Sequence, residues 1–348
     1  MKIAVITDTH FGARNDAEIF SEYFYRFIDG VFLPYLETHD IKTVLHLGDL
    51  VDRRKYINFK TLQRLRTRFM KALQDRGIEV HFVLGNHDVF FKNTSELNSV
   101  TELFAGLDNL TIYSEPTIIE FDGLELGLVP WINRSNYDDA IKFLETATSE
   151  IIMGHFEIKG FEVIKGIRFE SGLTADMFKR FEAVYSGHFH HKQEKGNITY
   201  LGSPFQITFS DLGSTKGFHV FDTETREMEF IENPCSMFHK FLYDDLKNDY
   251  DTTKDRSQYK NTYVKIVVVN KTKPYIFERF IDAFYDAGVA NLSIIEDFGV
   301  DDGLVEVLDL ELDTMTLISN EIDSMEHLEK PEKLKTLIQS LYVEALDS

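Results

Sequence analysis

Residues 43–52 read Thr-Val-Leu-His-Leu-Gly-Asp-Leu-Val-Asp, and residues 79–88 repeat the design as Glu-Val-His-Phe-Val-Leu-Gly-Asn-His-Asp. In both, an apolar run typical of a buried strand is followed by glycine and then by residues that bind metal ions. A rigid sheet fixes side chains at its strand ends, while glycine lets the backbone turn sharply and approach a metal or a phosphate. Three further segments also follow strand-like runs and end in metal-ligand residue types: Asp8-Thr9-His10 and, again with glycine before the ligand, Gly154-His155 and Gly187-His188-Phe189-His190.

The residue types in these segments predict a centre for two metal ions. In Asp-x-His and His-x-His, alternate residues of an extended segment point to the same side, so each pair can reach one cluster. Nitrogen and oxygen ligands without thiolate suit Mn²⁺, Fe²⁺ or Zn²⁺ better than Ca²⁺ or a structural zinc. Each segment alone could be an unrelated core histidine or turn carboxylate. All five in this order are hard to explain in that way. The predicted ligands are Asp8, His10, Asp49, Asn86, His155, His188 and His190.

Short apolar runs and amphipathic stretches alternate along the first two thirds of the chain. Helices are predicted at 18–36, 59–76, 137–147 and 175–181, and Asp122-Gly123 predicts a hairpin turn between two strands. This order predicts an α/β fold of two packed sheets with helices outside. The predicted strands are 2–7, 43–47, 79–84, 111–113, 117–121, 124–129, 151–153, 183–185, 198–201, 217–221 and 228–231.

The last third predicts a separate, smaller organisation. Residues 244–260 are polar, with almost no apolar periodicity, and we interpret them as a linker. A small α+β unit follows, with strands at 263–269 and 292–295 and a helix at 275–287. An apolar stripe then continues in a predicted C-terminal helix. It could pack on its own domain, which the pattern slightly favours, or dock on a partner. The stripe is Leu334, Leu337, Ile338, Leu341, Tyr342 and Ala345.

Charge is distributed unevenly along the 348 residues, whose formal net charge is −21. Acidity argues against nucleic acid as a partner, because phosphate backbones attract cations. Residues 53–76, however, contain nine lysines and arginines and a single acid, Asp75, whereas 290–348 contain 15 acids and three lysines. The basic stretch is explained equally well by a polar partner surface and by a solvated helix face.

Composition also limits the compartment. The single cysteine, Cys235, excludes an internal disulfide framework, and the first apolar stretch is too short for a secretory signal. No run approaches the roughly 20 apolar residues of a membrane span. We therefore expect a reducing, cytoplasmic environment and no membrane association.

The order of the five motifs resembles the calcineurin-like metallophosphoesterase superfamily. Further segments resemble its SbcD branch, the nucleases of double-strand-break repair, including the recombination nuclease subunits of T-even-type phages. These segments are Asp122-Gly123, Pro130-Trp131, Gly154-His155-Phe156-Glu157, Leu201-Gly202-Ser203-Pro204 and Lys216-Gly217-Phe218. The resemblance implies a four-layer α/β/β/α nuclease domain at 1–243, a DNA-positioning cap domain at 261–303 and a helical segment at 312–348 that binds an ATPase.

The same resemblance implies a role for each site residue. Asp8, His10 and His190 would hold the first ion, and Asn86, His155 and His188 the second, with Asp49 bridging. The ions, most simply Mn²⁺ with Mg²⁺ as an alternative, would activate water and stabilise negative charge. His87 would lie beside the scissile phosphate and stabilise the transition state or protonate the leaving oxygen. Asp52 departs from family members that have histidine at its position.

The implied activity is Mn²⁺-dependent hydrolysis of DNA, 3′ to 5′ on duplex ends and endonucleolytic on single strands. Arg53, Arg54 and Lys55 directly follow the Asp49 loop and are predicted to contact DNA. An SbcC-type coiled-coil ATPase would bind Leu334, Leu337, Leu341 and Tyr342.

The resemblance also implies a homodimer built on helices in the first half of the chain, with 18–36 and 59–76 as candidates. Core packing explains their aromatic faces equally well. A phage-encoded chain would act in the bacterial host cytoplasm. The alternatives are a small-molecule phosphatase or phosphodiesterase with the same site, and a non-catalytic scaffold, which has no need for a complete ligand set.

Overall fold

The computed structural model describes residues 1–296 apart from Lys165 and Thr252, and six isolated positions beyond them: Ile322, Leu334, Lys335, Leu337, Ile338 and Leu341. The chain divides into two compact units. The first consists of Met1–Ile207 and Gly213–Cys235, and the second of Thr208–Leu212 and Ser236–Ser348. All seven predicted metal ligands therefore belong to the first unit.

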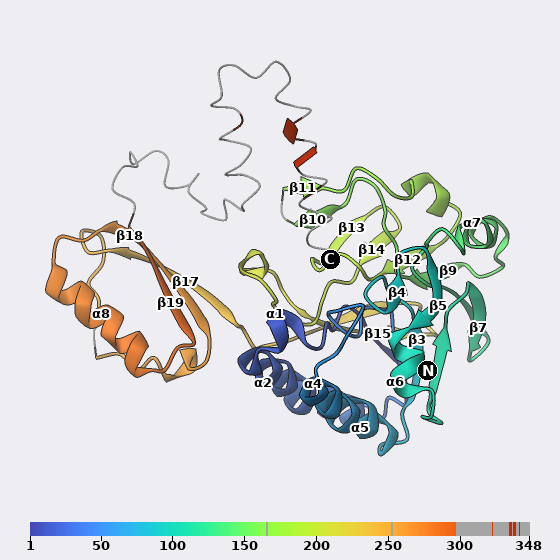
Figure 1. The fold of residues 1–348 in the computed structure, drawn as a ribbon, viewed down its shortest axis with the longest axis horizontal. Helices are drawn as coiled ribbons and strands as arrows, with labels where there is room; N and C mark the ends of the chain where they lie inside the picture. Colours follow the sequence, from blue (N-terminus) through green and yellow to red (C-terminus); the bar gives the residue numbers. More distant parts are fainter. Residues whose placement is uncertain are drawn as a thin grey trace. The chain divides into compact units, whose positions relative to one another are not determined.

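The first unit is built on two six-stranded sheets (Figure 1). One has the order β16 (Met228–Glu232), β15 (Gly217–Asp222), β1 (Lys2–Ile6), β2 (Thr43–His46), β3 (Glu79–Val83) and β6 (Leu110–Tyr113). The other has the order β13 (Gln193–Lys195), β14 (Ile198–Tyr200), β12 (Ala183–Ser186), β9 (Ile151–Gly154), β8 (Leu124–Val129) and β7 (Thr117–Phe121). Strands β1, β2, β3 and β6 are parallel, as are β14, β12, β9 and β8. The carboxyl ends of each parallel set therefore meet at one sheet edge.

Apolar side chains join the layers of this unit. The inner faces of the sheets bury Ile3, Val5, Leu45, Leu47, Leu126, Leu128, Ile151 and Met153 in one cluster. Beyond the second sheet, α7 (Tyr137–Thr146) and the 3-10 turn η3 (Ala175–Phe178) bury Ala140, Leu144 and Phe178 with Ile152 and Val184. Beyond the first sheet, the rings of Phe27 and Phe32 pack on Phe218 of β15. The layers run helix, sheet, sheet, helix, which confirms the predicted α/β sandwich.

The two long helices on the first sheet each contain a π-helical segment. One continues from α2 (Glu18–Phe27) through η1 (Ile28–Phe32) to α3 (Leu33–Thr38). The other continues from α4 (Phe59–Arg64) through η2 (Leu65–Met70) to α5 (Lys71–Gln74), and α2, α4 and α5 lie together in Figure 1. The apolar stripe of the first helix is buried in the core of its own unit, as the core-packing alternative predicted.

The Asp122-Gly123 turn is confirmed in detail. Strands β7 and β8 pair with Phe121 opposite Leu124, and both turn residues have positive φ, 48° and 80°. Such a two-residue turn matches the twist of its strands. Short elements escaped prediction because they span too few residues for a period. In this unit they are α1 (Ala13–Asp16), β4 (Val89–Phe91), β5 (Thr94–Asn98), α6 (Ser99–Phe104), β10 (Glu162–Ile164), β11 (Ile167–Arg168) and β13 (Gln193–Lys195).

The second unit has a three-stranded parallel sheet in the order β17 (Phe238–Asp244), β18 (Tyr263–Asn270) and β19 (Asn291–Glu296). Helix α8 (Pro274–Asp286) covers one face, where Phe277, Phe280 and Phe284 pack with Ile266 and Val268. Two 3-10 turns, η4 (Phe209–Asp211) and η5 (Ser257–Tyr259), belong to the same unit.

The division of the chain differs from the one expected at 243–261. Strand β17 pairs with β18 and therefore belongs to the second unit. Residues 244–260, expected as a linker, pack there as well: the ring of Tyr250 stacks on Tyr243 at 4.4 Å, and the Arg256 guanidinium lies 4.9 Å from the Phe280 ring. Two large side chains in a polar stretch anchor it without producing any periodicity.

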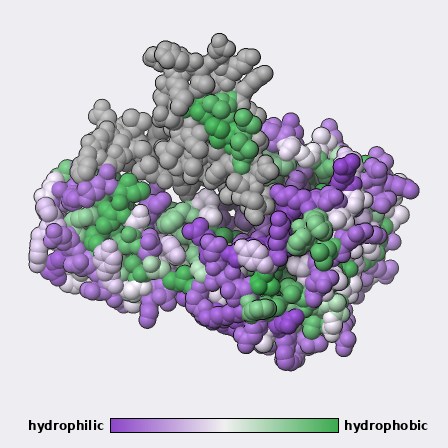
Figure 2. All heavy atoms as spheres, viewed as in Figure 1, coloured by the Kyte–Doolittle hydropathy of each residue, from purple (hydrophilic) through white to green (hydrophobic). Residues whose placement is uncertain are grey.

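Most of the predicted helical segment at 312–348, including Tyr342, lies outside the described residues, as do residues 297–303. Leu334, Leu337 and Leu341 are described and helical, and Leu337 and Leu341 are about half exposed. Within the described part of the chain, no helix has the length and apolar character needed to cross a membrane. The surface in Figure 2 is largely hydrophilic, with separate apolar patches.

Candidate metal centre

Loops at the carboxyl ends of five strands bring the predicted ligands together. In the first sheet, Asp8 and His10 follow β1, Asp49 follows β2 and Asn86 follows β3. From the second sheet, His155 follows β9, and His188 and His190 follow β12. Ligand-type atoms of Asp8, His10 and His190 lie within 4.8 Å of one another, and so do those of Asp49, His155 and His188. The sequence motifs thus converge on two neighbouring groups.

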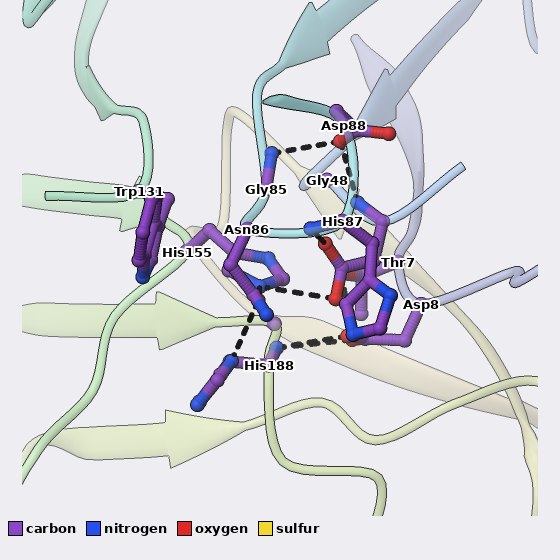
Figure 3. A network of polar contacts seen from close by, with 12 residues as sticks. Thr7, Asp8, Gly48, Gly85, Asn86, His87, Asp88, Trp131, His155 and His188 are labelled. Carbon is purple, nitrogen blue, oxygen red and sulfur yellow. Dashed lines mark hydrogen bonds and ion pairs between the residues drawn. The ribbon is translucent and has the colours of Figure 1, made fainter. Parts of the chain in front are cut away.

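Asn86 belongs to the second of these groups (Figure 3). Its Oδ1 lies 2.8 Å from His155 Nε2 and 2.9 Å from His188 Nδ1. The other ring nitrogen of His155 donates to the Leu47 carbonyl at 2.8 Å, so Nε2 keeps its lone pair in the neutral ring. Asp49 Oδ2 lies 3.4 Å from the same Nε2. If the Asn86 amide were turned over, its nitrogen would donate hydrogen bonds to His155 and His188. In the orientation described, Asn86 Oδ1 and the two ring nitrogens lie close together, as the ligands of one cation do.

The first group has the same character. His10 Nε2 and His190 Nε2 face each other at 3.0 Å, a separation that suits two nitrogens turned toward one ion. Asp49 Oδ2 lies 3.7 Å from His10 Nε2, in addition to its approach to His155 in the second group. Asp49 therefore occupies the position between the groups that a bridging carboxylate requires.

Burial shifts the pKa values of the ionisable side chains in this cluster. Asp8 is fully buried, and burial together with the neighbouring Asp49 charge raises the pKa of Asp8 to about 7, despite His155. Burial opposes a charge on His155, yet the Asp49 carboxylate outweighs it and raises the pKa of His155 to about 10. Burial lowers the pKa values of His10 and His188, which keeps both rings neutral. Protons thus compensate a negative charge that divalent cations would neutralise on binding.

Close backbone approach at glycine holds two of the loops together. A Cβ on Gly48 would lie 2.6 Å from the Gly85 Cα, and a Cβ on Gly85 would lie 2.3 Å from Asp49 Oδ1. Both contacts are far shorter than real side chains allow, which confirms why glycine precedes these ligands. Four ligands have positive φ: Asp8 52°, His10 40°, Asp49 57° and His188 88°. Such strained backbone concentrates at functional sites.

Asp88 completes this framework, a role that its sequence motif did not predict. Its carboxylate is buried and accepts backbone N–H bonds from Asp49 at 2.7 Å, Gly85 at 2.8 Å and Leu50 at 2.9 Å. It therefore locks the Asp49 loop to the Asn86 loop. The position of Asp88 directly after Asn86-His87 indicated a role in the site. The sequence did not show that its carboxylate binds backbone N–H groups rather than a metal ion.

His87 lies between the ligand groups and the Asp52 loop. Its backbone N–H donates to Asp49 Oδ1 at 2.8 Å, and its Nδ1 donates to the Asp52 carbonyl at 2.6 Å. The carbonyl fixes the tautomer of the neutral ring and leaves Nε2 available. Its ring packs edge-on against His10 at 4.8 Å between centroids. His87 also lies within ligand distance of His10 and Asp49, so position alone does not separate it from the ligands.

The basic stretch at 53–76 has a different environment from the one predicted for a DNA-facing surface. Carboxylates on and just before the first long helix pair with it: Arg53 Nη1 with Asp16 at 2.9 Å, Arg64 with Glu18 at 2.6 Å and Arg76 with Glu37 at 2.6 Å. Lys60 and Arg68 are paired in the same way with Glu18 and Asp29. The cluster in sequence is therefore largely neutralised within the fold, whereas Lys55 is exposed.

Comparison with known proteins identifies the class. Residues 1–192 match the family model described as calcineurin-like phosphoesterase. The chain is 34% identical over 275 residues to exonuclease subunit 1 of Enterobacteria phage T4, covering 78% of each chain. It is 25% identical over 262 residues to the SbcD component of nuclease SbcCD from Staphylococcus epidermidis, covering 66% of this chain and 67% of the relative. Its identity to the SbcD component from Escherichia coli K12 is 22% over 277 residues, covering 67% and 68%.

A buried N/O ligand cluster at the strand ends of a double-sheet sandwich defines a metal-dependent hydrolase of phosphate esters. The chain belongs to the calcineurin-like phosphoesterase family, which confirms the resemblance inferred from its motifs.

Proposed function

We propose that this chain is the nuclease subunit of a DNA recombination and repair complex, and that it hydrolyses phosphodiester bonds at a two-metal centre. The observation that carries this proposal is the convergence of two ligand groups on Asp49. The names of the relatives, exonuclease subunit 1 and the SbcD component of nuclease SbcCD, support DNA as the substrate.

Each ligand group would hold one ion. Asp8, His10 and His190 form the first site, and Asn86, His155 and His188 form the second, with Asp49 shared. Two bound divalent ions would supply Lewis acidity for attack of water on phosphorus and for stabilising the charge that develops. Mn²⁺ fits the mixture of imidazole and oxygen ligands better than Mg²⁺, which prefers oxygen alone.

His87 would act on the substrate directly. With Nδ1 bound to the Asp52 carbonyl, Nε2 is the ring atom left to face a phosphate. In the protonated ring this atom donates a hydrogen bond to a phosphate oxygen, or a proton to the leaving oxygen. Asp52 assists by fixing the ring, and its carboxylate lies 3.8 Å from His10 Nδ1.

The substrate would be approached through the loop that follows Asp49. We propose that Arg54 and Lys55 contact DNA. Arg53 would act indirectly, because it donates to Asn15 and Asp16 and so fixes the turn that follows His10. Residues 261–303, in the second unit, would serve as the cap that positions DNA. The activity would be 3′ to 5′ on duplex ends and endonucleolytic on single strands.

The partners would be a coiled-coil ATPase of the SbcC type and a second copy of this chain. The ATPase would bind the stripe of Leu334, Leu337, Leu341 and Tyr342, and two members of that stripe, Leu337 and Leu341, have half-exposed apolar side chains. The complex would act in the cytoplasm of a bacterial host. If deletion of 312–348 left co-purification with the ATPase intact, this assignment of the partner surface would be wrong.

The proposed activity is tested with end-labelled duplex DNA and single-stranded DNA, each incubated with Mn²⁺, Mg²⁺ or chelator, with and without the ATPase. We expect Mn²⁺-dependent cleavage that chelator abolishes and that His87→Ala reduces without loss of metal. Rapid turnover of bis(p-nitrophenyl) phosphate with no cleavage of either DNA would instead assign the site to a small-molecule phosphodiesterase.

A further inference from the structure

Arg54 differs from the other basic residues at 53–76 in burying guanidinium donors that have no acceptor. Among the described residues, no carboxylate forms an ion pair with it. Its Nε and Nη1 are buried and have no hydrogen-bond acceptor, while Nη2 lies 3.1 Å from the Asn86 side-chain amide. The neighbouring Arg53 is held by Asp16 and Asn15 instead. One arginine of the loop is thus satisfied within the chain, and the other places Nη2 beside Asn86 of the metal centre.

An aromatic ring, rather than an ion pair, positions this guanidinium. Arg54 Cζ lies 5.4 Å from the centre of the Trp131 ring. Trp131 is 9% exposed and is held at two points: its backbone N–H donates to the Leu84 carbonyl at 2.8 Å, and its indole Nε1–H donates to Glu157 Oε1 at 2.7 Å. A cation over an indole face is stabilised without using its N–H groups. The Arg54 guanidinium is therefore held by a contact that uses none of its N–H groups.

The side-chain amide of Asn86 lies between Arg54 and the metal-ligand histidines. When Asn86 Oδ1 faces His155 and His188, its amide nitrogen faces Arg54 Nη2, so that two donors meet. This orientation is the one that presents oxygen to an ion. Nη2 then faces another donor, and the buried Nε and Nη1 have no acceptor. Buried donors without acceptors are costly to maintain.

The missing partner must be an anion with several acceptor oxygens. The guanidinium fork matches two oxygens of a phosphate and binds them with charge-assisted hydrogen bonds. We propose that Arg54 binds the non-bridging oxygens of the scissile phosphate on the Asn86 side of the centre and stabilises the negative charge that develops there. This inference rests on the proposed function and assigns Arg54 to the reacting group rather than to remote DNA backbone.

The test compares Arg54→Gln and Arg54→Lys with Arg66→Gln, which makes the same change in charge on the basic helix, where Arg66 donates to the Leu103 carbonyl. Inorganic phosphate is titrated calorimetrically into the full chain equilibrated with Mn²⁺, and bound Mn²⁺ is measured separately. We expect Arg54→Gln to weaken phosphate binding about 10- to 100-fold, the loss of a charged hydrogen-bond pair, with bound Mn²⁺ unchanged. Arg54→Lys should fall in between, because it keeps the charge and loses the fork, and Arg66→Gln should match wild type.

Two results would overturn the assignment. Phosphate affinity within twofold of wild type in Arg54→Gln would show that the guanidinium does not touch the phosphate. Loss of Mn²⁺ from Arg54→Gln would show that it acts by positioning Asn86. Failure of the proposed function is recognised separately: wild-type protein would then bind phosphate through Arg54 and still not cleave DNA.

Discussion

The ligand loops and the two long helices of the first unit both gather charged residues, but they are organised in opposite ways. On the helices, cations meet carboxylates, as in Arg64 with Glu18 and Arg76 with Glu37. In the loops, ligand-type atoms face one another, as at Asn86 with His155 and at His10 with His190. The charges on the helices are paired within the chain, whereas the ligand atoms of the loops require bound cations as partners. A concentration of charge in sequence therefore indicates binding only where the fold leaves it unpaired.

The largest effect expected is that of Asp49→Asn, which removes the carboxylate shared by both groups. We predict at least a roughly 1000-fold loss of hydrolysis, since two ions contribute several kcal/mol to the transition state. Bound Mn²⁺ should fall together with activity in equilibrium dialysis with metal analysis. Asp75→Asn makes the same change on the helix side, where Asp75 pairs with Lys71, and should leave both quantities intact.

His87→Ala should separate chemistry from metal binding. Removing a general acid or a phosphate hydrogen bond costs about 10²- to 10⁴-fold in rate, while the seven ligands stay in place. The cleavage rate and the bound Mn²⁺ are measured on one preparation. An exposed histidine on the other region, His39 stacked on Tyr35, supplies the control His39→Ala. If His87→Ala lost an ion, His87 would be a ligand after all.

Asp88→Asn tests the framework behind the ligands. The carboxylate accepts three backbone N–H bonds, and an amide directs its own N–H₂ at some of these donors. We expect a loss of about 2–4 kcal/mol in the free energy of unfolding in chelator, and roughly 10- to 100-fold weaker Mn²⁺ binding. Urea unfolding and a metal titration measure the two. Unchanged stability would mean that the loops are locked by other contacts.

The smallest effect is expected on the helices. Arg64→Gln removes pairs with Glu18 and Glu22 that are partly exposed, with the Glu18 side chain at 52%, and surface pairs of this kind contribute about 0–1 kcal/mol. The slope of log DNA affinity against log salt should not change, because this charge is already neutralised. A shallower slope, as expected for a lost phosphate contact, would return the helix to the DNA-binding surface.

The sequence predicted most of this arrangement because strands, helical periods and ligand types are local signals. The ligand residues could be grouped because each follows an apolar run that forms a strand. What could not be predicted depends on distant partners. The carboxylates that neutralise Arg64 and Arg76 lie on a helix some 40 residues earlier in the chain, and the role of Asp88 depends on backbone N–H groups of another loop. The lack of an acceptor for Arg54 Nε and Nη1 likewise depends on residues that are distant in the sequence.

Anomalous diffraction at the manganese edge, from crystals of the full chain grown with Mn²⁺, would show whether two ligand groups share Asp49. We predict two peaks roughly 3.5–4 Å apart, one bound by Asp8, His10 and His190 and the other by Asn86, His155 and His188, with Asp49 on both. A single peak, or two peaks of which one does not touch Asp49, would contradict this prediction.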